Sequence, residues 1–205
     1  MSLFIAFEGG EGSGKSTQAR MLYRHFLRLH VPALLTREPG GTSLGNKICR
    51  WVKRQGESIS PETELLLFNA SRAQLVRELL RPGLQAGKMI ICDRYTESTL
   101  AYQGYGRGLD LDVIQSINNI ATDGLRPHLI VLMDIDPELG LARKNPEQID
   151  RFEKEELAFH QRVRQGYLKM AQEEPDLWLV IDASSNIEDV QHIIWQRVSI
   201  LLQSG

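Results

Sequence analysis

Five short apolar runs recur along the 205-residue chain, and longer segments with apolar residues at helical spacing separate them. The runs cover residues 3–7, 33–36, 89–92, 129–133 and 178–181. Two of them, at 89–92 and 129–133, are apolar almost throughout, which is typical of strands buried on both faces. Because strands and helices alternate, the pattern predicts an α/β fold, with a five-stranded parallel sheet flanked by helices.

The segments between the runs predict helices at 15–29, 61–80, 110–122, 137–143, 153–174 and 187–202. Ser60 and Pro61 make a good helix entry, because serine caps a helix start and proline suits the first turn. The polar stretch 144–150, with Pro146, interrupts two helical segments and predicts a short lid at about 143–151. Since the chain has no repeat or long linker, we expect one domain over residues 1–205.

Composition narrows the possible partners. The net charge of -2 argues against a protein that tracks a nucleic-acid backbone, so no nucleic-acid partner is expected. No apolar run is long enough to span a bilayer, which predicts no membrane partner and a cytoplasmic location. With only two cysteines, the chain is consistent with a reducing compartment, and Cys92 is expected to be a buried thiol.

A glycine-rich stretch follows the first predicted strand and matches G-x-x-x-x-G-K-[ST]. Glycines let backbone N–H groups converge on phosphate oxygens, and the next helix points its positive end at the same anion. Lys15 adds a charge for the β- and γ-phosphates, and the Ser16 hydroxyl is suited to Mg²⁺. The alternative is a glycine-rich turn that binds nothing. The nucleotide-binding candidates are Gly10, Glu11, Gly12, Ser13, Gly14, Lys15, Ser16 and Thr17.

In open parallel sheets, ligands lie beyond the carboxyl ends of the strands. The residues after the second and third predicted strands, 37–42 and 93–95, are rich in charge or glycine and fit this rule. After the fourth strand, Asp134 and Asp136 are either site residues or helix caps, and a cap is the preferred reading for Asp136.

Several longer motifs resemble those of one family. They are Phe7-Glu8-Gly9, Thr36-Arg37-Glu38-Pro39-Gly40-Gly41-Thr42, Phe68-Asn69-Ala70-Ser71-Arg72-Ala73-Gln74, Asp93-Arg94-Tyr95, Ala101-Tyr102-Gln103-Gly104-Tyr105-Gly106-Arg107-Gly108 and Asp150-Arg151-Phe152-Glu153. Together and in this order they resemble the bacterial thymidylate kinases over nearly the whole chain. The resemblance implies a P-loop fold and transfer of the γ-phosphoryl group of ATP, with Mg²⁺, to thymidine monophosphate (dTMP), giving dTDP and ADP in dTTP biosynthesis.

The resemblance also implies roles near the reacting phosphates. Phosphoryl transfer depends mostly on positioning and charge neutralisation, so arginines are expected to dominate. Arg94 is similar to the arginine thought to bridge the acceptor phosphate and the donor γ-phosphate, and an ion pair with Asp93 is its weaker alternative. Asp93 is expected to support Mg²⁺ through water, and Ser16 to hold it. Glu11 is similar to an acidic residue near the acceptor 3′-hydroxyl, the alternative being a solvated loop carboxylate.

Recognition of the acceptor base is implied at two further places. Phe68 and Arg72 are four residues apart, hence on one face of a helix. They resemble a pair in which a ring stacks on thymine and a guanidinium reaches its carbonyl, although Phe68 alone would be read as a core residue. Thr99, Tyr102 and Gln103 resemble residues of the thymine and deoxyribose pocket, with the tyrosine excluding a ribose 2′-hydroxyl. The resemblance adds Glu38, Pro39 and Ser98 as substrate-binding candidates.

Two departures qualify the resemblance. Many relatives carry an acceptor-phosphate arginine seven residues after Thr42, where this chain has Cys49. The neighbouring Arg50 is turned by about 100° on a helix, so it can replace that arginine only if the local helix is shifted. The predicted lid is also poor in arginine, so either Arg143 or Arg151 is expected to bring positive charge to the transition state.

The sequence therefore predicts a cytoplasmic thymidylate kinase that uses ATP and Mg²⁺ and, by analogy, forms a homodimer through the segments 61–80 and 110–122. Two alternatives stay open. One is a nucleoside monophosphate or deoxynucleoside kinase with another acceptor. The other is a nucleotide-binding regulator that has lost activity.

Overall fold

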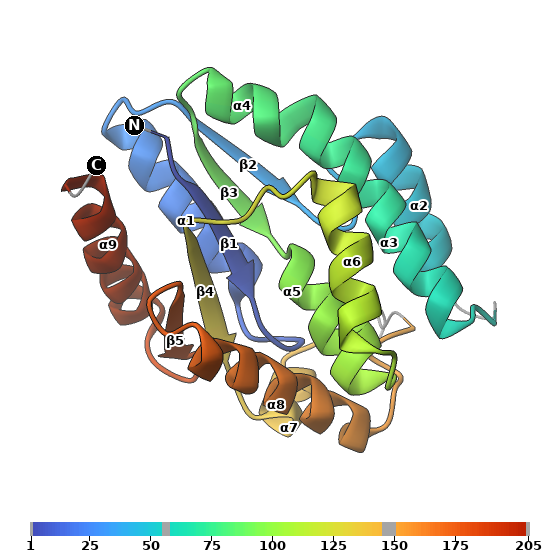
Figure 1. Ribbon diagram of the computed structural model, residues 1–205. Coiled ribbons are helices and arrows are strands. Elements are labelled where there is room, and N and C mark those ends of the chain that lie inside the picture. The colour runs from blue at the N-terminus through green and yellow to red at the C-terminus, as the bar shows by residue number, and fades with distance from the viewer. Residues whose placement is uncertain (1, 55–57, 145–150, 204–205) are drawn as a thin grey trace.

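The computed structural model describes residues 2–54, 58–144 and 151–203. Its centre is a five-stranded sheet in the order β2-β3-β1-β4-β5, in which every neighbouring pair is parallel (Figure 1). The strands are β1 (Phe4–Glu8), β2 (Ala33–Arg37), β3 (Met89–Asp93), β4 (Leu129–Asp134) and β5 (Trp178–Asp182). The predicted α/β fold with a five-stranded parallel sheet is confirmed.

A charged residue ends each of these strands. They are Glu8, Arg37, Asp93, Asp134 and Asp182. Because parallel strands share one carboxyl edge, the sheet collects these charges along a single rim, where ligands of such sheets bind. Every strand thus runs one residue beyond the apolar run that predicts it.

Helices enclose this sheet. The longer ones are α1 (Lys15–Arg28), α2 (Ser43–Lys53), α3 (Pro61–Leu75), α6 (Leu111–Thr122), α8 (Leu157–Glu173) and α9 (Ile187–Gln203). The shorter ones are η1 (Val76–Leu80), α4 (Arg81–Gln85), α5 (Thr96–Thr99), η2 (Leu100–Gly106) and α7 (Pro137–Ala142), of which η1 and η2 have π-helical geometry.

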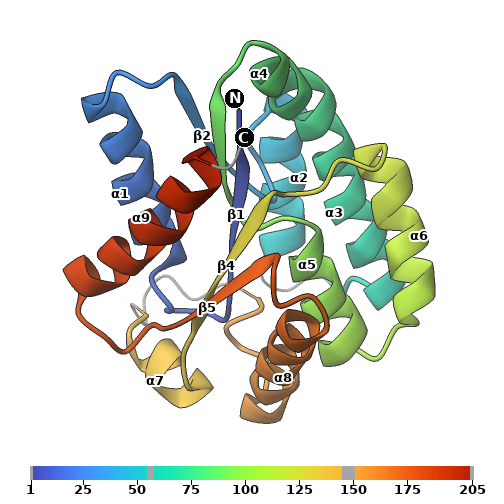
Figure 2. The same cartoon turned by 60° about the vertical axis from the view of Figure 1, so that its left-hand side comes forward.

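The two faces of the sheet bury two apolar cores. Alternate residues of β1 divide between them: Phe4 and Ala6 join one core, and Ile5 and Phe7 join the other. In Figure 2, α1 and α9 lie on one side of the sheet, and α2, α3, α6 and α8 lie on the other. This double covering explains why the central strands are apolar throughout.

Most predicted helices are present, with three differences. The helix predicted at 61–80 continues through a π-helical turn into α4. The helix predicted to start at residue 153 begins only at Leu157; the residues from 151 to 154 form turns, and Phe152 among them is buried in the core. The segments α2 and α5–η2 are additional helices, which the sequence patterns do not predict.

Candidate active site

The glycine-rich stretch forms a tight loop between β1 and α1. Gly12 has a positive φ of 66°, and a Cβ added there would lie 1.8 Å from the carbonyl oxygen of Gly140 in α7. Glycine is therefore required, because any side chain would collide with backbone. The Lys15 ammonium is buried in the loop and donates to the Gly10 carbonyl at 2.5 Å and to Ser13 Oγ at 3.1 Å.

A cavity of about 470 Å³ opens in front of this loop. Its lining includes the predicted residues Glu11, Gly12, Ser13, Gly14, Lys15, Ser16, Thr17, Asp93, Arg94 and Arg143. The Ser16 hydroxyl donates to the Asp93 carboxylate, which joins the start of α1 to the end of β3. The structure therefore brings the two predicted metal-binding residues into direct contact at the phosphate loop.

Arg94 follows β3 and adopts a positive φ of 74°, an uncommon conformation for a side chain of this size. Its guanidinium pairs with Glu11 at 2.6 Å and donates to Tyr102 Oη at 3.1 Å and Ser98 Oγ at 3.2 Å. The alternative ion pair with the adjacent Asp93 is not the one formed. Glu11 is 15% exposed and held by Arg94, so it is not a solvated loop carboxylate.

A buried carboxylate, Glu8, holds in place residues next to Arg94. Glu8 is fully buried at the end of β1 and accepts from Tyr95 N at 2.7 Å, Ser98 Oγ at 2.6 Å and Tyr167 Oη at 2.8 Å. Burial raises the pKa of Glu8, while Arg94 opposes that shift. The sequence gives Glu8 no role, although it stands inside the motif Phe7-Glu8-Gly9.

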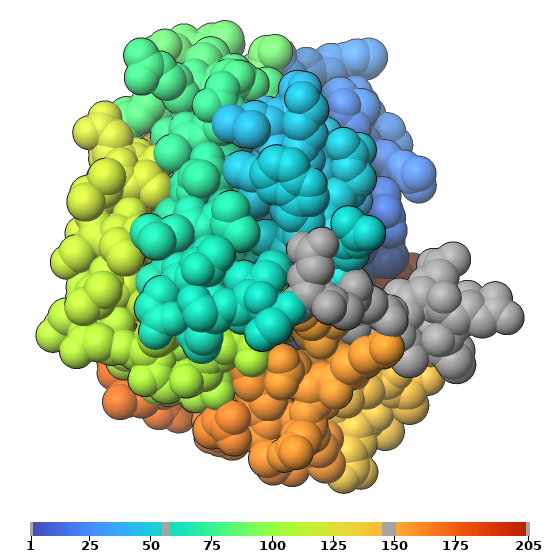
Figure 3. All heavy atoms as spheres, turned by 90° about the vertical axis from the view of Figure 1, so that its right-hand side faces the viewer, coloured from blue at the N-terminus to red at the C-terminus, as the bar shows by residue number. Residues whose placement is uncertain are grey.

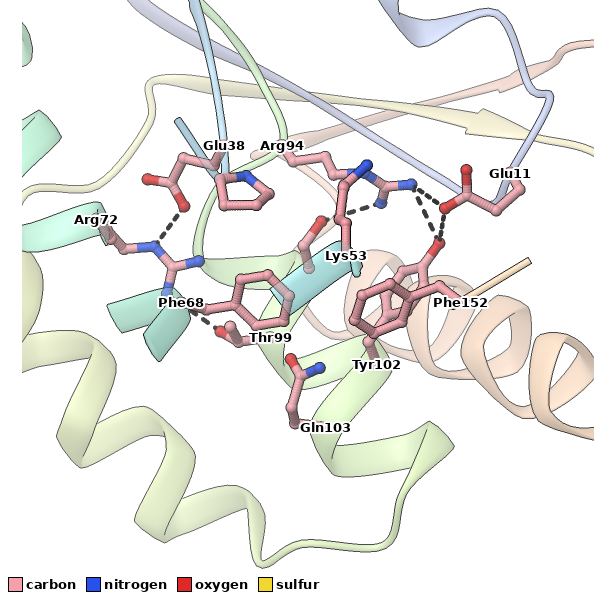
Figure 4. A pocket seen from close by; sticks show the side chains of 12 residues that line it. Glu11, Glu38, Lys53, Phe68, Arg72, Arg94, Thr99, Tyr102, Gln103 and Phe152 are labelled. Carbon is pink, nitrogen blue, oxygen red and sulfur yellow. Dashed lines mark hydrogen bonds and ion pairs between the residues drawn. The ribbon is translucent and has the colours of Figure 1, made fainter. Parts of the chain in front are cut away.

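A second cavity adjoins the first on the side of α3 and η2 (Figure 4). It is lined by all of the predicted substrate-binding residues, Glu38, Pro39, Phe68, Arg72, Arg94, Ser98, Thr99, Tyr102 and Gln103. Lys53, Glu11 and Phe152 complete its lining. The structure thus brings residues of six separate segments to one site.

Arg72 lies at the base of this second cavity and is 2% exposed. It pairs with Glu38 at 2.8 Å and donates to Asn118 Oδ1 at 2.7 Å and to the Tyr95 carbonyl at 3.0 Å. These bonds fix the guanidinium plane. Burial raises the pKa of Glu38 to about 7, and Arg72 counteracts that rise.

Aromatic rings and a second ionic cluster form the outer wall. Phe152 packs against Phe68 with ring centroids 5.9 Å apart and against Tyr102 at 6.0 Å. Phe152 belongs to the motif Asp150-Arg151-Phe152-Glu153, but the sequence alone gives it no role. Behind this wall, the buried Glu64 accepts from Arg151 and from Arg107.

The two predicted lid arginines lie in different places. Arg143 lines the loop cavity and donates to the Ala183 carbonyl at 3.1 Å. Arg151 pairs with Glu64, stacks on Phe152 with its guanidinium carbon 4.8 Å from the ring centroid, and lines neither cavity. Residues 145–150 of the predicted lid fall outside the described ranges. Lys144 contacts the site as well, 3.5 Å from Glu11.

Electrostatics favour an ionised Glu11. Burial by itself would raise the pKa of its carboxyl, but Arg94, Lys15 and Lys144 together hold that pKa well below its usual range. The lining of the loop cavity has six lysine and arginine side chains against three carboxylates, as expected of a site for polyphosphates.

Across the part of the chain that the structure describes, no helix combines the length and apolar character needed to cross a membrane. The parallel sheet, the phosphate loop at its carboxyl rim and the two adjoining cavities define a P-loop nucleotide-binding enzyme fold.

Comparisons with known proteins identify the family. The thymidylate kinase family model matches residues 7–194. The chain is 54% identical to a thymidylate kinase of Dehalococcoides mccartyi over 98% of both chains, and 46% identical to that of Thermomicrobium roseum over 100% of this chain and 98% of the relative. The solved thymidylate kinase of Ehrlichia chaffeensis superposes with a TM-score of 0.80, at 30% identity, covering 97% of this chain and 98% of the other. The chain belongs to the thymidylate kinase family.

Proposed function

We propose that this chain transfers the γ-phosphoryl group of ATP to dTMP, producing dTDP and ADP for dTTP synthesis. Family membership supports the activity. The observation that carries it structurally is the meeting of two cavities. Both are lined by Glu11, Glu38, Pro39, Lys53 and Arg94. An acceptor in one cavity can therefore present its phosphate to a donor bound at the phosphate loop.

The donor site is the loop cavity. The loop N–H groups and the start of α1 are suited to bind the ATP phosphates, and Lys15 to neutralise the β- and γ-phosphates. Mg²⁺ commonly uses one or two carboxylates together with substrate phosphates. The Ser16 hydroxyl and the Asp93 carboxylate, already in contact, fit that donor set. When bound there, Mg²⁺ neutralises charge on the donor phosphates.

Arg94 is the central residue of transfer in this proposal. It lines both cavities, and its planar fork can hold the acceptor phosphate while facing the transferring group. Glu11, fixed by Arg94 and by Tyr102 Oη at 2.8 Å, is placed to orient the acceptor 3′-hydroxyl. Arg143 supplies further positive charge from the lid side. Arg151 is proposed to act only if it leaves Glu64, since that ion pair holds it away from both cavities.

The acceptor cavity suits a thymine nucleotide. The Phe68 ring is available for stacking, and the buried Arg72 is positioned to donate to a thymine carbonyl. Thr99, Gln103 and Ser98 surround the same space, with Glu38 and Pro39 opposite. Tyr102 crowds the place where a ribose 2′-hydroxyl would lie, so selection against ribonucleotides is steric and should be moderate.

Three further properties are proposed from the family resemblance. The chain acts as one domain over residues 1–205, works in the cytoplasm, and forms a homodimer. The outward faces of α3 and α6, which lie beside each other in Figure 3, are the proposed contact surface. They expose Leu66, Val113 and Ile120.

The test is an assay of ADP release with ATP and Mg²⁺. The acceptors compared are thymidine, deoxyuridine, deoxycytidine, deoxyguanosine and uridine monophosphates. Preference for dTMP is the expected result. Preference for another acceptor would overturn the substrate assignment. Tight ATP binding without turnover of any acceptor would instead favour the inactive regulator.

A further inference from the structure

Lys53 is the last residue of α2 and lines both cavities. Two of the residues shared by the cavities are cations, Lys53 and Arg94, and in Figure 4 the Lys53 side chain extends toward Arg94. The shared boundary is where an acceptor phosphate must meet the donor γ-phosphate. A lysine there is placed to bind that phosphate.

The geometry of α2 decides which of its residues reach this boundary. Cys49 and Lys53 are four residues apart and lie on one face of the helix. Cys49 lines the loop cavity, whereas Arg50 is exposed and lines neither cavity. The cation that α2 presents to the site therefore comes from its last residue, and Arg50 does not take that place.

The chemistry of a lysine suits this position. Its ammonium carries three donors on a flexible stem, so it can follow a phosphate without fixing one orientation. Arg94 beside it is held by Glu11, Ser98 and Tyr102. With Arg94 aligned on the transferring group, the Lys53 ammonium adds a second charge that compensates the acceptor phosphate.

We propose that Lys53 binds the α-phosphate of the acceptor nucleotide and distinguishes a monophosphate from its nucleoside. The proposal rests on the function proposed above. It assigns to this chain a phosphate-binding residue at the end of α2, in place of one in the preceding turn.

The test is Lys53→Met, which keeps most of the aliphatic stem and removes the charge. A lost charge-assisted hydrogen bond typically corresponds to about 10-fold to 100-fold in binding. We expect kcat/KM for dTMP to fall by about that factor. The dissociation constant of dTMP, measured by calorimetry, should rise similarly. The dissociation constant of thymidine should stay within about two-fold, because thymidine has no phosphate for Lys53 to bind.

Arg50→Met is the matched control, since it removes a positive charge from the same helix outside both cavities. It should leave all of these constants unchanged. Introducing Cys49→Arg into the Lys53→Met variant should recover dTMP binding, because residue 49 lines the loop cavity on the same helical face. Unfolding midpoints of all variants establish that the fold is intact.

Two results would overturn the proposal. One is unchanged dTMP binding in Lys53→Met. The other is an equal loss for dTMP and thymidine, which would mean that Lys53 acts only through the structure of the pocket. Failure of the proposed function gives a different result, namely an unmutated chain that does not phosphorylate dTMP.

Discussion

Lys15 is buried, and we expect its protonation state to depend on whether the phosphate loop holds polyphosphate. Burial and the nearby Arg94 together lower its pKa to about 8, although Glu11 and Asp93 partly oppose the shift. Bound polyphosphate should raise that pKa again. We therefore expect MgATP binding near pH 8 to take up about half a proton per site, and binding near pH 6.5 to take up almost none.

Calorimetric titrations in buffers of different ionisation enthalpy measure this uptake. The titration at the lower pH serves as the control, because Lys15 is already protonated there. A binding enthalpy that does not depend on the buffer between about pH 7 and 9 would contradict the assignment.

Glu97 is a buried carboxylate whose charge should affect the stability of the fold. It is 8% exposed, and its Oε2 has no hydrogen-bond partner among the described residues. Burial, together with Glu8, raises its pKa to about 7. The folded protein therefore binds the Glu97 proton more tightly than the unfolded chain does, and this residue's stabilising contribution is lost as the pH rises from about 4.5 to 7.

Glu97→Gln keeps the shape and removes the charge. We expect the variant to be about 1–3 kcal/mol more stable than the unmutated chain at pH 8, and equally stable near pH 4.5. Urea unfolding at the two pH values measures the difference. Glu138→Gln, at an exposed carboxylate, is the control. A stability gain that is the same at both pH values would show that the charge of Glu97 is not its cause.

Of the individual site residues, the sequence predicts many of those expected to bind substrate, but not the residues that hold them in place. The phosphate loop follows from local spacing, which a sequence displays directly. The role of the Phe68–Arg72 pair is implied by the family resemblance, because the spacing shows only that the two residues share a helix face. The roles of Glu8, Lys53 and Phe152 depend on contacts between segments far apart in the chain, which no spacing rule encodes. The different positions of Arg143 and Arg151 likewise depend on distant partners, the Ala183 carbonyl for Arg143 and Glu64 in α3 for Arg151.

Among the elements, the buried strands are the best predicted, because continuous apolar runs have few other interpretations. The helix α2 is missed because its first turns contain Thr42, Gly45 and Asn46, which are typical of loops. Here the Thr42 hydroxyl caps the helix by accepting from Gly45 N at 3.0 Å. A local capping hydrogen bond thus starts a helix in a segment of loop-like composition.

The short helix α7 packs against the phosphate loop through a glycine. Gly140 lies against the phosphate loop, and a Cβ added there would be 2.3 Å from the Glu11 carbonyl oxygen. Alanine normally stabilises a helix by about 0.5–1 kcal/mol relative to glycine. Gly140→Ala should instead weaken MgATP binding by about ten-fold or more, because the loop backbone must move.

Calorimetric MgATP titration compares this variant with Leu139→Ala, whose side chain is 56% exposed on the same helix. The Leu139 variant should bind MgATP normally. Unchanged binding by Gly140→Ala would mean that the loop tolerates displacement.

For the whole molecule, the arrangement of the sheet concentrates charge at one rim and leaves apolar side chains elsewhere on the surface. Leu66, Val113 and Ile120 are 57%, 53% and 83% exposed, on helices that contact each other. Exposed apolar side chains on adjoining helices are common at contacts between subunits. The expected homodimer would bury them.

Ile120→Asp tests that expectation. In a symmetric dimer one substitution places two charges in the contact, and burying unpaired charge is costly. We expect light scattering to give twice the mass of one chain for the unmutated protein and one chain for Ile120→Asp. The control Ile193→Asp, at an exposed position of α9 on the opposite side of the sheet, should leave the mass unchanged. A dimer that survives Ile120→Asp at micromolar concentration would place the contact elsewhere, and a monomeric unmutated chain would remove the homodimer from the proposal.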